Sequence, residues 1–387
     1  MTDTIFHALV LNLHQPAGNL ESLLTHQPWQ TKEILYALDR IPRALWSPYD
    51  DLGRVHVSLS GTLLETLADP EFQRRVYGWV KCGDLLWYLQ NSKIIEILGT
   101  GYYHPVLPLM PNADWEQHLS RWQGLAAHLF SRAHFAGFWP PEMGFTLELI
   151  PYLKRLGYRY VIVDSEHVVA KRPMSWQQLR YRPHIARYGD DELIIIVRDR
   201  ELSNAQESGM SPQWFIEEVT ARTRGCAVPP LVTTCTDGDN GGWFRNATGS
   251  NFWQAFYQPL LQQRQHQDTA IRPCFIHEYL DRYGVEGEVL VRTGAWNTGD
   301  HSGIGFVQWT GSQAQKDALQ RVKETSAHFH ALRSQIQPNN SESLETAHWH
   351  LLRAQTSCYF YWGEAWLPRC HQELDIVWQH LNEIQAF

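Results

Sequence analysis

The chain has 387 residues, of which 43% are hydrophobic, and its formal net charge at pH 7 is −8. This length can bury the core of one large domain, or of a large domain with a smaller one. The negative charge disfavours a nucleic-acid partner, because phosphate contacts need a basic surface. No stretch approaches the roughly 20 apolar residues of a membrane-spanning helix.

The N-terminus and the cysteines bear on compartment and cofactors. Residues 1–13 lack the basic start and the small-residue cleavage site of a signal peptide, so we interpret their apolar run as a strand. The six cysteines form no CxxC pair and lack zinc-site spacing, which indicates scattered reduced thiols. We therefore expect a cytoplasmic protein without a membrane partner, a metal or another cofactor. The oligomeric state has no signature in the sequence.

Seven short apolar runs recur up to about residue 245, and helix-compatible stretches lie between them. Continuous apolar runs are typical of strands buried on both faces of a parallel sheet, so the alternation predicts an α/β architecture. The expected strands are Phe6–Leu13, Val55–Ser60, Ile94–Gly99, Phe135–Trp139, Tyr160–Val163, Leu193–Val197 and Leu231–Thr234. The expected helices include Phe72–Leu89, Trp115–Ala133, Thr146–Leu156 and Pro212–Arg222.

From about residue 310 the pattern becomes helical, with helices expected at Gln313–Ile336, Ser343–Trp362 and Cys370–Ile384. Pro338 and Gly363 fall near the breaks, where such residues end helices. We predict a domain over residues 1–309 and a C-terminal helical bundle over residues 310–387. At the second break, Trp362, Glu364 and Trp366 could cover an active-site cleft, but we favour an aromatic cluster packed in the core.

Polar residues follow most of the predicted strands at the same topological point. They include His14, His104, Glu142, Asp164, Arg198 and Asp237. In a parallel barrel the C-terminal strand ends meet on one face, where active sites are built. An open doubly wound sheet would give a similar pattern.

Two of these strand ends carry candidate acids. In the first, Pro140 and Pro141 cannot continue a strand ladder, and they fix Glu142 beside Trp139. A surface glutamate after a turn would fit the same pattern.

The second acid, Asp237, opens a glycine-rich loop that also holds Asp239 and Trp243. Its oxygen ligands suggest a metal site, but the spacing is not that of an EF-hand loop, and a polar turn fits as well. The 17 tryptophans of the chain either pack in the core or present flat rings to a sugar.

Together, five segments resemble the motifs of glycoside hydrolase family 57, in that family's order across about residues 6–310. They are Asn12–Pro16, Gly99–Met110, Trp139–Phe145, Thr234–Trp243 and the stretch from Gly294 to Trp309. The resemblance implies a (β/α)7 barrel followed by a helical bundle. It also implies an enzyme that acts on an α-glucan oligo- or polysaccharide with retention of anomeric configuration.

The resemblance places Glu142 as the nucleophile and Asp237 as the general acid/base. It places His14 and His104 at substrate contacts, and it implies that the fifth segment lines the groove with Trp296. This agrees with the chemistry, since a retaining glycosidase needs one attacking carboxylate and one protonated carboxyl. The further substrate-binding residues that we expect are Trp139, Trp243, Asp239 and Arg198. An arginine here could also orient a carboxylate or tie the barrel mouth together.

Two departures from the family pattern and two rival interpretations remain. Asp239 stands where the family usually has glutamate, and the chain is shorter than many glucan-transferring and branching members. A metal-dependent deacetylase or mannosidase-like hydrolase could use His14, His104, Asp164 and Asp237, but neither His14 nor His104 has the close His-x-Asp or His-x-x-x-His spacing of such sites. A non-catalytic carbohydrate-binding protein is the other alternative.

Overall fold

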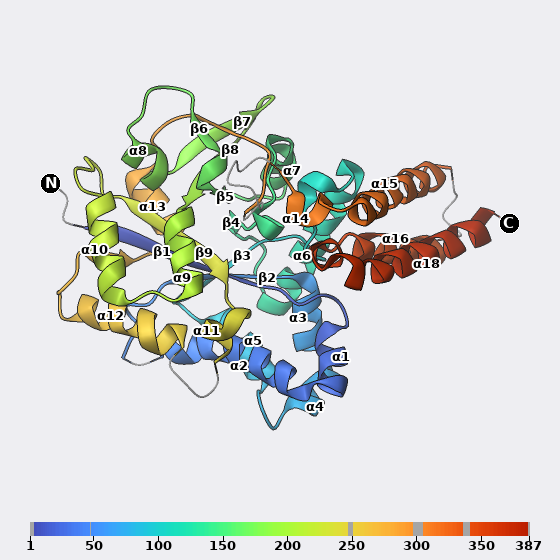
Figure 1. The fold of residues 1–387 in the computed structure, drawn as a ribbon, viewed down its shortest axis with the longest axis horizontal. Coiled ribbons are helices and arrows are strands. Elements are labelled where there is room, and N and C mark those ends of the chain that lie inside the picture. Colours follow the sequence, from blue (N-terminus) through green and yellow to red (C-terminus); the bar gives the residue numbers. More distant parts are fainter. Residues whose placement is uncertain (1–3, 47, 247–250, 297–304, 336–340, 386–387) are drawn as a thin grey trace.

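The computed structural model describes residues 4–46, 48–246, 251–296, 305–335 and 341–385. Its centre is a ring of parallel strands in the order β3-β2-β1-β9-β8-β5-β4 (Figure 1). These strands match the seven predicted runs to within a few residues. They are β1 (Ile5–Leu13), β2 (Val55–Leu59), β3 (Ile95–Leu98), β4 (Gly137–Phe138), β5 (Tyr160–Asp164), β8 (Asp191–Arg198) and β9 (Leu231–Asp237).

The ring closes where the end of β3 meets β4. The amide of Gly99 donates to the carbonyl of Gly137 at 2.9 Å, and the amide of Trp139 donates to the carbonyl of Gly99 at 2.7 Å. Glycine is needed at both places, because a Cβ at Gly99 would overlap the Tyr158 ring and one at Gly137 would overlap the Tyr160 ring. This closure confirms the predicted (β/α)7 barrel over the open-sheet alternative.

Replacing Gly99 with alanine should therefore lower the free energy of unfolding by about 1–3 kcal/mol, since the added methyl overpacks the closure. The matched control is Gly124→Ala, where a Cβ meets nothing within 4 Å on an exposed helix face. That change should stabilise the fold by up to about 1 kcal/mol. Thermal unfolding followed by circular dichroism measures both. Equal midpoints for Gly99→Ala and wild type would contradict the role given to Gly99.

Four short strands were not predicted. β10 (Ile271–Pro273) adds parallel to β1, and β7 (His184–Tyr188) pairs antiparallel with β8. β6 (Val168–Ala170) pairs with β11 (Val289–Val291) in a separate two-stranded sheet. Each is three to five residues long.

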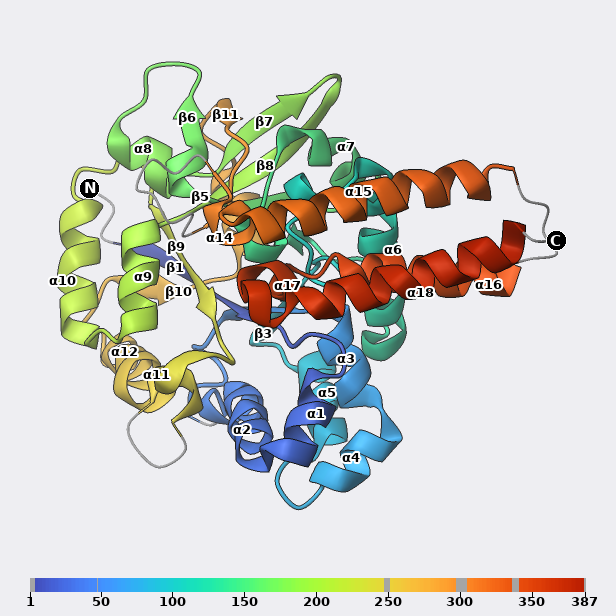
Figure 2. The same ribbon diagram turned by 45° about the vertical axis from the view of Figure 1, so that its right-hand side comes forward.

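Helices surround the barrel (Figures 1 and 2). They are α1 (Asn19–His26), α2 (Pro28–Ala44), α3 (Gly61–Ala68), α4 (Pro70–Val76), α5 (Cys82–Asn91), α6 (Asn112–Phe130), α7 (Ile150–Arg155), α8 (Trp176–Tyr181), α9 (Arg200–Ser208), α10 (Pro212–Arg222), α11 (Gly241–Arg245), α12 (Gln258–Gln265) and α13 (Ile276–Tyr283). The single helix predicted over Phe72–Leu89 is wrong, because the chain turns at Gly78 between α4 and α5. Among the described helices, none combines the length and apolarity needed to cross a membrane.

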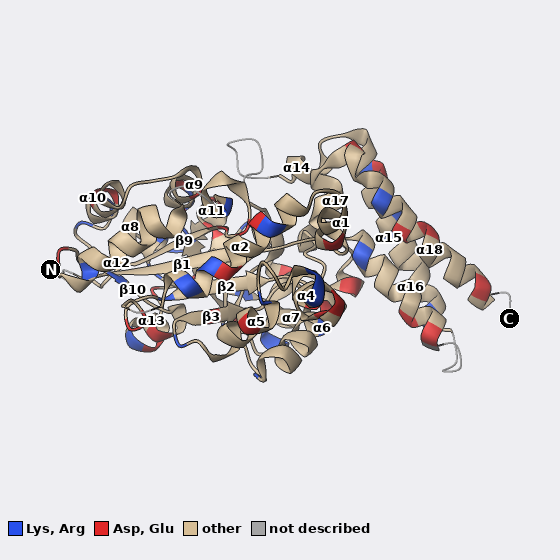
Figure 3. Cartoon of the chain, turned by 90° about the horizontal axis from the view of Figure 1, so that it is seen from below, with Lys and Arg blue, Asp and Glu red and all other residues tan. Residues whose placement is uncertain are grey.

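The C-terminal region is helical, as predicted. Its helices are α14 (Val307–Thr310), α15 (Gln313–Arg333), α16 (Ser341–Ala354), α17 (Ser357–Tyr361) and α18 (Leu367–Gln385). Figure 3 shows α15, α16 and α18 extending from one side of the barrel, with acidic and basic residues along them. The boundary predicted at 309/310 falls within α14 and stays a prediction.

The helix predicted over Ser343–Trp362 is interrupted between α16 and α17. At the break, the side-chain amide nitrogen of Gln355 donates to Asp114 of α6 at 2.6 Å. The side-chain oxygen of Gln355 lies 3.0 Å from Nε2 of His118. Asp114 also accepts from Ser326 and contacts His330, both on α15. These buried bonds tie the bundle to the barrel and turn α17 toward the barrel mouth.

Candidate active site

One cavity of about 200 Å³ opens at the C-terminal ends of the barrel strands. Six residues predicted for the site line it, namely Glu142, Asp237, His14, His104, Trp296 and Asp239. The other lining residues are Asn12, Glu207, Asn240, Gln308, Cys358, Tyr361 and Trp362. The six residues therefore share one cavity.

The backbone at Glu142 is held in an uncommon conformation. Its φ of 55° and ψ of 21° lie in the left-handed region, which residues other than glycine rarely adopt. The surrounding chain imposes it, since Pro140 and Pro141 precede Glu142 and its carbonyl accepts from the Trp296 amide at 3.0 Å. Strain of this kind concentrates at functional sites, so the backbone itself marks Glu142 as a candidate.

Both oxygens of the Glu142 carboxylate are held. Ser357 donates to Oε1 at 2.7 Å, and the indole of Trp296 donates to Oε2 at 2.9 Å. Nδ1 of His104 lies 3.5 Å from Oε1. Burial acts to raise the pKa of Glu142, but His104, Ser357 and Trp296 together outweigh it and hold that pKa below its ordinary value. Glu142 is therefore arranged to be a carboxylate.

Asp237, the last residue of β9, has the opposite character. Burial, followed by the nearby charges of Asp239 and Glu142, raises the pKa of Asp237 well above its ordinary value. A hydrogen bond from Asn12, at 2.9 Å, opposes this only in part. One cavity thus holds one carboxyl favoured in its charged form and one favoured in its neutral form.

Two histidines form a stacked pair beside the acids. The rings of His14 and His104 lie 4.0 Å apart with an interplanar angle of 9°. Both ring nitrogens of His14 are buried and have no hydrogen-bond partner among the described residues. Burial and the neighbouring His104 lower the pKa of His14 well below its ordinary value. His14 therefore brings a neutral ring, whose nitrogens have unused hydrogen-bonding capacity, to the cavity lining.

Asp239 is bound to the loop that follows β1. Gln15 donates to its side chain at 2.8 Å, Asn19 donates in turn to Gln15, and Arg245 donates to the Asp239 backbone carbonyl at 2.6 Å. Burial raises the pKa of Asp239. The shorter side chain in place of glutamate is therefore satisfied within the protein.

Three residues expected to bind substrate are not among those that line the cavity. Trp139 is fully buried and packs edge-on against Trp296 at 5.5 Å. Trp243 packs against Gly209, where a Cβ would overlap its ring. Arg198 is fully buried and pairs with Asp164 at 2.6 Å. None of the three lines the cavity, so their contact with substrate stays a prediction.

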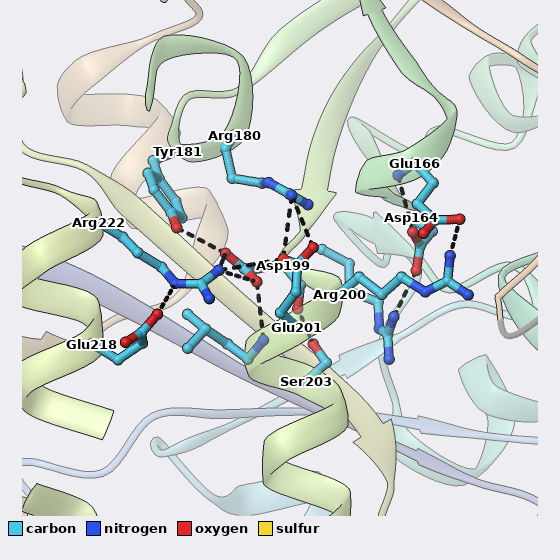
Figure 4. A network of polar contacts seen from close by, with 12 residues as sticks. Asp164, Glu166, Arg180, Tyr181, Asp199, Arg200, Glu201, Ser203, Glu218 and Arg222 are labelled. Carbon is cyan, nitrogen blue, oxygen red and sulfur yellow. Dashed lines mark hydrogen bonds and ion pairs between the residues drawn. The ribbon is translucent and has the colours of Figure 1, made fainter. Parts of the chain in front are cut away.

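The partner of Arg198, Asp164, lies in a network of polar contacts (Figure 4). The Nε atom of Arg198 donates to the carbonyl of Cys235 on β9 at 3.0 Å, which joins β5, β8 and β9. Beyond it, Asp199 caps α9 and accepts a hydrogen bond from Tyr181 at 2.8 Å. Glu166, which follows β5, pairs with Arg200. The network stabilises the strand ends that carry Asp237.

The bundle contributes residues that the sequence interpretation missed. Cys358, Tyr361 and Trp362 line the cavity, and the Trp362 side chain is 55% exposed. The expectation that Trp362 packs in the core is therefore wrong. The Thr356-Ser357 pair, a helix-start signal inside an apparently continuous helix, could have indicated the break. Of the fifth predicted segment, residues 297–304 lie outside the described residues.

Within the described residues, one group has the spacing of a possible metal site. It comprises Asp114, His330 and His348, whose ligand atoms lie within 4.8 Å of one another. None of the three lines the cavity, and they lie where α6 meets the bundle. The residues weighed for a metal-dependent hydrolase, such as His14 and Asp164, do not form such a group in the described part of the chain.

The closed parallel barrel and the carboxyls at its C-terminal strand ends define the class of barrel proteins with an active site at that face. The family model of glycosyl hydrolase family 57 matches residues 9–292. The α-amylase of Pyrococcus abyssi is 26% identical over 288 residues, which cover 72% of this chain and 39% of the amylase. The 4-α-glucanotransferase of Thermococcus kodakarensis is 27% identical over 190 residues, which cover 49% of this chain and 26% of that enzyme.

A solved structure agrees in fold. The GH57-type branching enzyme from Pyrococcus horikoshii has a TM-score of 0.74 at 14% identity, over 98% of this chain and 88% of that one. The chain therefore belongs to glycosyl hydrolase family 57, which confirms the family indicated by the sequence motifs. The match covers only 39% of the length of the α-amylase and 26% of the length of the 4-α-glucanotransferase.

Proposed function

We propose that the protein cleaves or transfers α-glycosidic bonds of α-glucans with retention of anomeric configuration. Glu142 is the nucleophile and Asp237 the general acid/base. The observation that carries this proposal is the opposite shift of two pKa values in one cavity, lowered for Glu142 and raised for Asp237. Paired carboxyls whose environments separate their pKa values mark the nucleophile and the acid of such a reaction.

The reaction has two balanced steps. First, a Glu142 oxygen bonds to the anomeric carbon while the glycosidic C–O bond breaks, and the Asp237 proton goes to the leaving oxygen. Next, the Asp237 carboxylate takes a proton from water or from a sugar hydroxyl, whose oxygen attacks the same carbon and frees Glu142. Water gives hydrolysis, and a sugar hydroxyl gives transfer.

The cavity lining supports a sugar substrate. Tyr361 and Trp362 are 47% and 55% exposed as residues, and their rings suit packing against the C–H faces of a pyranose. The polar side chains of His14, Glu207 and Asn240 line the same cavity, as hydroxyl-binding residues would. The relatives named as α-amylase and 4-α-glucanotransferase favour α-glucans as the substrate class.

Incubation with maltooligosaccharides and with pullulan, in the presence of EDTA, tests the proposal. We expect product formation at an unchanged rate in EDTA, because the mechanism uses two carboxyls and no metal. Shorter sugars alone indicate hydrolysis, and a spread of longer and shorter chains indicates transfer. Inactivity on every α-glucan, together with an EDTA-sensitive activity on another polysaccharide, would support the metal-dependent alternative instead.

A further inference from the structure

The break between α16 and α17 delivers one serine to the candidate nucleophile. At the break, Thr356 forms an antiparallel bridge with Pro105, and the amide of Ser357 donates to the carbonyl of His104 at 3.0 Å. The Ser357 side chain is fully buried. The bundle is thus bonded through its backbone to the loop after β3, and Ser357 has a fixed place beside the barrel mouth.

The hydroxyl of Ser357 has a defined direction. Its single proton goes to Oε1 of Glu142 at 2.7 Å. The hydroxyl oxygen then faces Nδ1 of His104, 3.2 Å away, as an acceptor. Ser357 therefore connects His104 to Glu142, and it donates its one hydrogen bond to Glu142.

His104 is also connected to Asp237, through Asn12. Nε2 of His104 lies 3.3 Å from the Asn12 side-chain oxygen, and the Asn12 amide donates to Asp237 at 2.9 Å. The order of contacts is therefore Asp237, Asn12, His104, Ser357 and Glu142. Of these five residues, Ser357 alone comes from the C-terminal bundle.

We propose that Ser357 is a positioning residue that fixes the Glu142 carboxylate for attack and favours its charged form, which makes the bundle an integral part of the catalytic site. This inference rests on the proposed role of Glu142 as nucleophile. Without Ser357, Oε1 keeps only the longer contact to His104 at 3.5 Å, while Trp296 still holds Oε2. The carboxylate then gains rotational freedom about its remaining hydrogen bond.

The charge of the Glu142 carboxylate also depends on Ser357. Burial acts to raise the pKa of Glu142, and Ser357 is one of the groups that reverse this effect. A hydrogen bond to a charged acceptor is among the stronger ones in proteins, particularly in a buried site. Its loss moves the pKa of Glu142 upward, so a larger fraction of the enzyme is protonated and inactive at mildly acidic pH.

The test compares wild type with Ser357→Ala, which removes one oxygen and leaves the packing volume nearly unchanged. We expect kcat/KM on an aryl maltooligosaccharide to fall about ten- to a hundredfold, with KM changed far less than kcat. We also expect the acid limb of the kcat/KM profile to move upward by about one pH unit. The control is Ser334→Ala at the exposed end of α15, which should match wild type in both respects.

Ser357→Cys supplies a second variant of similar volume with a weak donor, and its acid limb should lie between those of wild type and Ser357→Ala. If Ser357→Ala does not fold, as judged by circular dichroism, the cysteine variant gives the same readout. A loss of rate with an unmoved acid limb would show a merely structural role and overturn the inference. Full activity of Ser357→Ala with an inactive Glu142→Gln would also overturn it, yet leave the proposed function standing. An active Glu142→Gln would instead remove the proposed function itself.

Discussion

Replacement of Glu142 by glycine is expected to lower the turnover of α-glucans by at least about 10⁴-fold, because the glycosyl-enzyme intermediate cannot form. Glycine is the better choice here than alanine. Residue 142 has a φ of 55°, which glycine adopts freely and which alanine adopts only with strain. The fold should therefore survive the change, and the loss can be assigned to chemistry.

Azide distinguishes this loss from general damage to the site. With an aryl α-maltooligosaccharide, azide should restore product formation to Glu142→Gly by occupying the space of the missing carboxylate. It should yield the β-glycosyl azide, since only one displacement occurs. The control is Glu148→Gln on the exposed side of the neighbouring turn, which should behave as wild type with or without azide. An α-glycosyl azide, or substantial turnover by Glu142→Gly without azide, would show that another group attacks the substrate.

Much of the barrel could be predicted because the signal is local. A strand buried on both faces is a run of apolar residues, and all seven barrel strands carry one. The closure could not be predicted this way. It depends on Gly99 meeting Gly137, which lie 38 residues apart along the chain, and on the tyrosine rings that leave no room for a Cβ.

In the candidate site, too, the residues with a strong local sequence signal were predicted and the others were not. Glu142 and Asp237 could be found because each follows a strand end directly, and the family motifs contain both. Ser357 and Trp362 were not found, since they lie in what reads as one continuous helix. The Thr356-Ser357 pair is a local signal of the break, but the break also depends on the Gln355 side chain reaching Asp114 and His118, which is a tertiary contact. For Arg198, a strand-end position does not reveal which way a side chain points, and the guanidinium pairs with Asp164.

Replacement of Asp237 by asparagine is the second change with a large expected effect, and its size should depend on the leaving group. Natural α-glucans leave as a poor sugar alkoxide unless they receive a proton, so kcat/KM on maltooligosaccharides should fall about 10²–10⁴-fold. An aryl substrate with an acidic phenol needs no such help, and its kcat/KM should stay within about tenfold of wild type. The control is Asp268→Asn, an exposed aspartate that does not line the cavity and should not distinguish the two substrates.

The second step should then limit turnover of the aryl substrate, because Asp237→Asn also lacks the base that activates water. Rapid mixing should show a burst of phenol followed by slow turnover, with kcat and KM lowered together. An equal loss on both substrates, without a burst, would contradict the acid/base assignment.

The acid role of Asp237 also predicts how kcat/KM depends on pH. Asp237 must be protonated in the first step, so kcat/KM on maltooligosaccharides should decline as the pH rises through its pKa, and this basic limb should disappear in Asp237→Asn. After burial, the largest contributions that raise this pKa come from Asp239 and Glu142. Asp239→Asn removes one of these charges and should move the basic limb to lower pH. Glycosylation of Glu142 removes the other charge within each catalytic cycle, so the pKa of Asp237 falls when it has to act as a base. A basic limb that Asp239→Asn leaves in place would mean that a group other than Asp237 donates the proton.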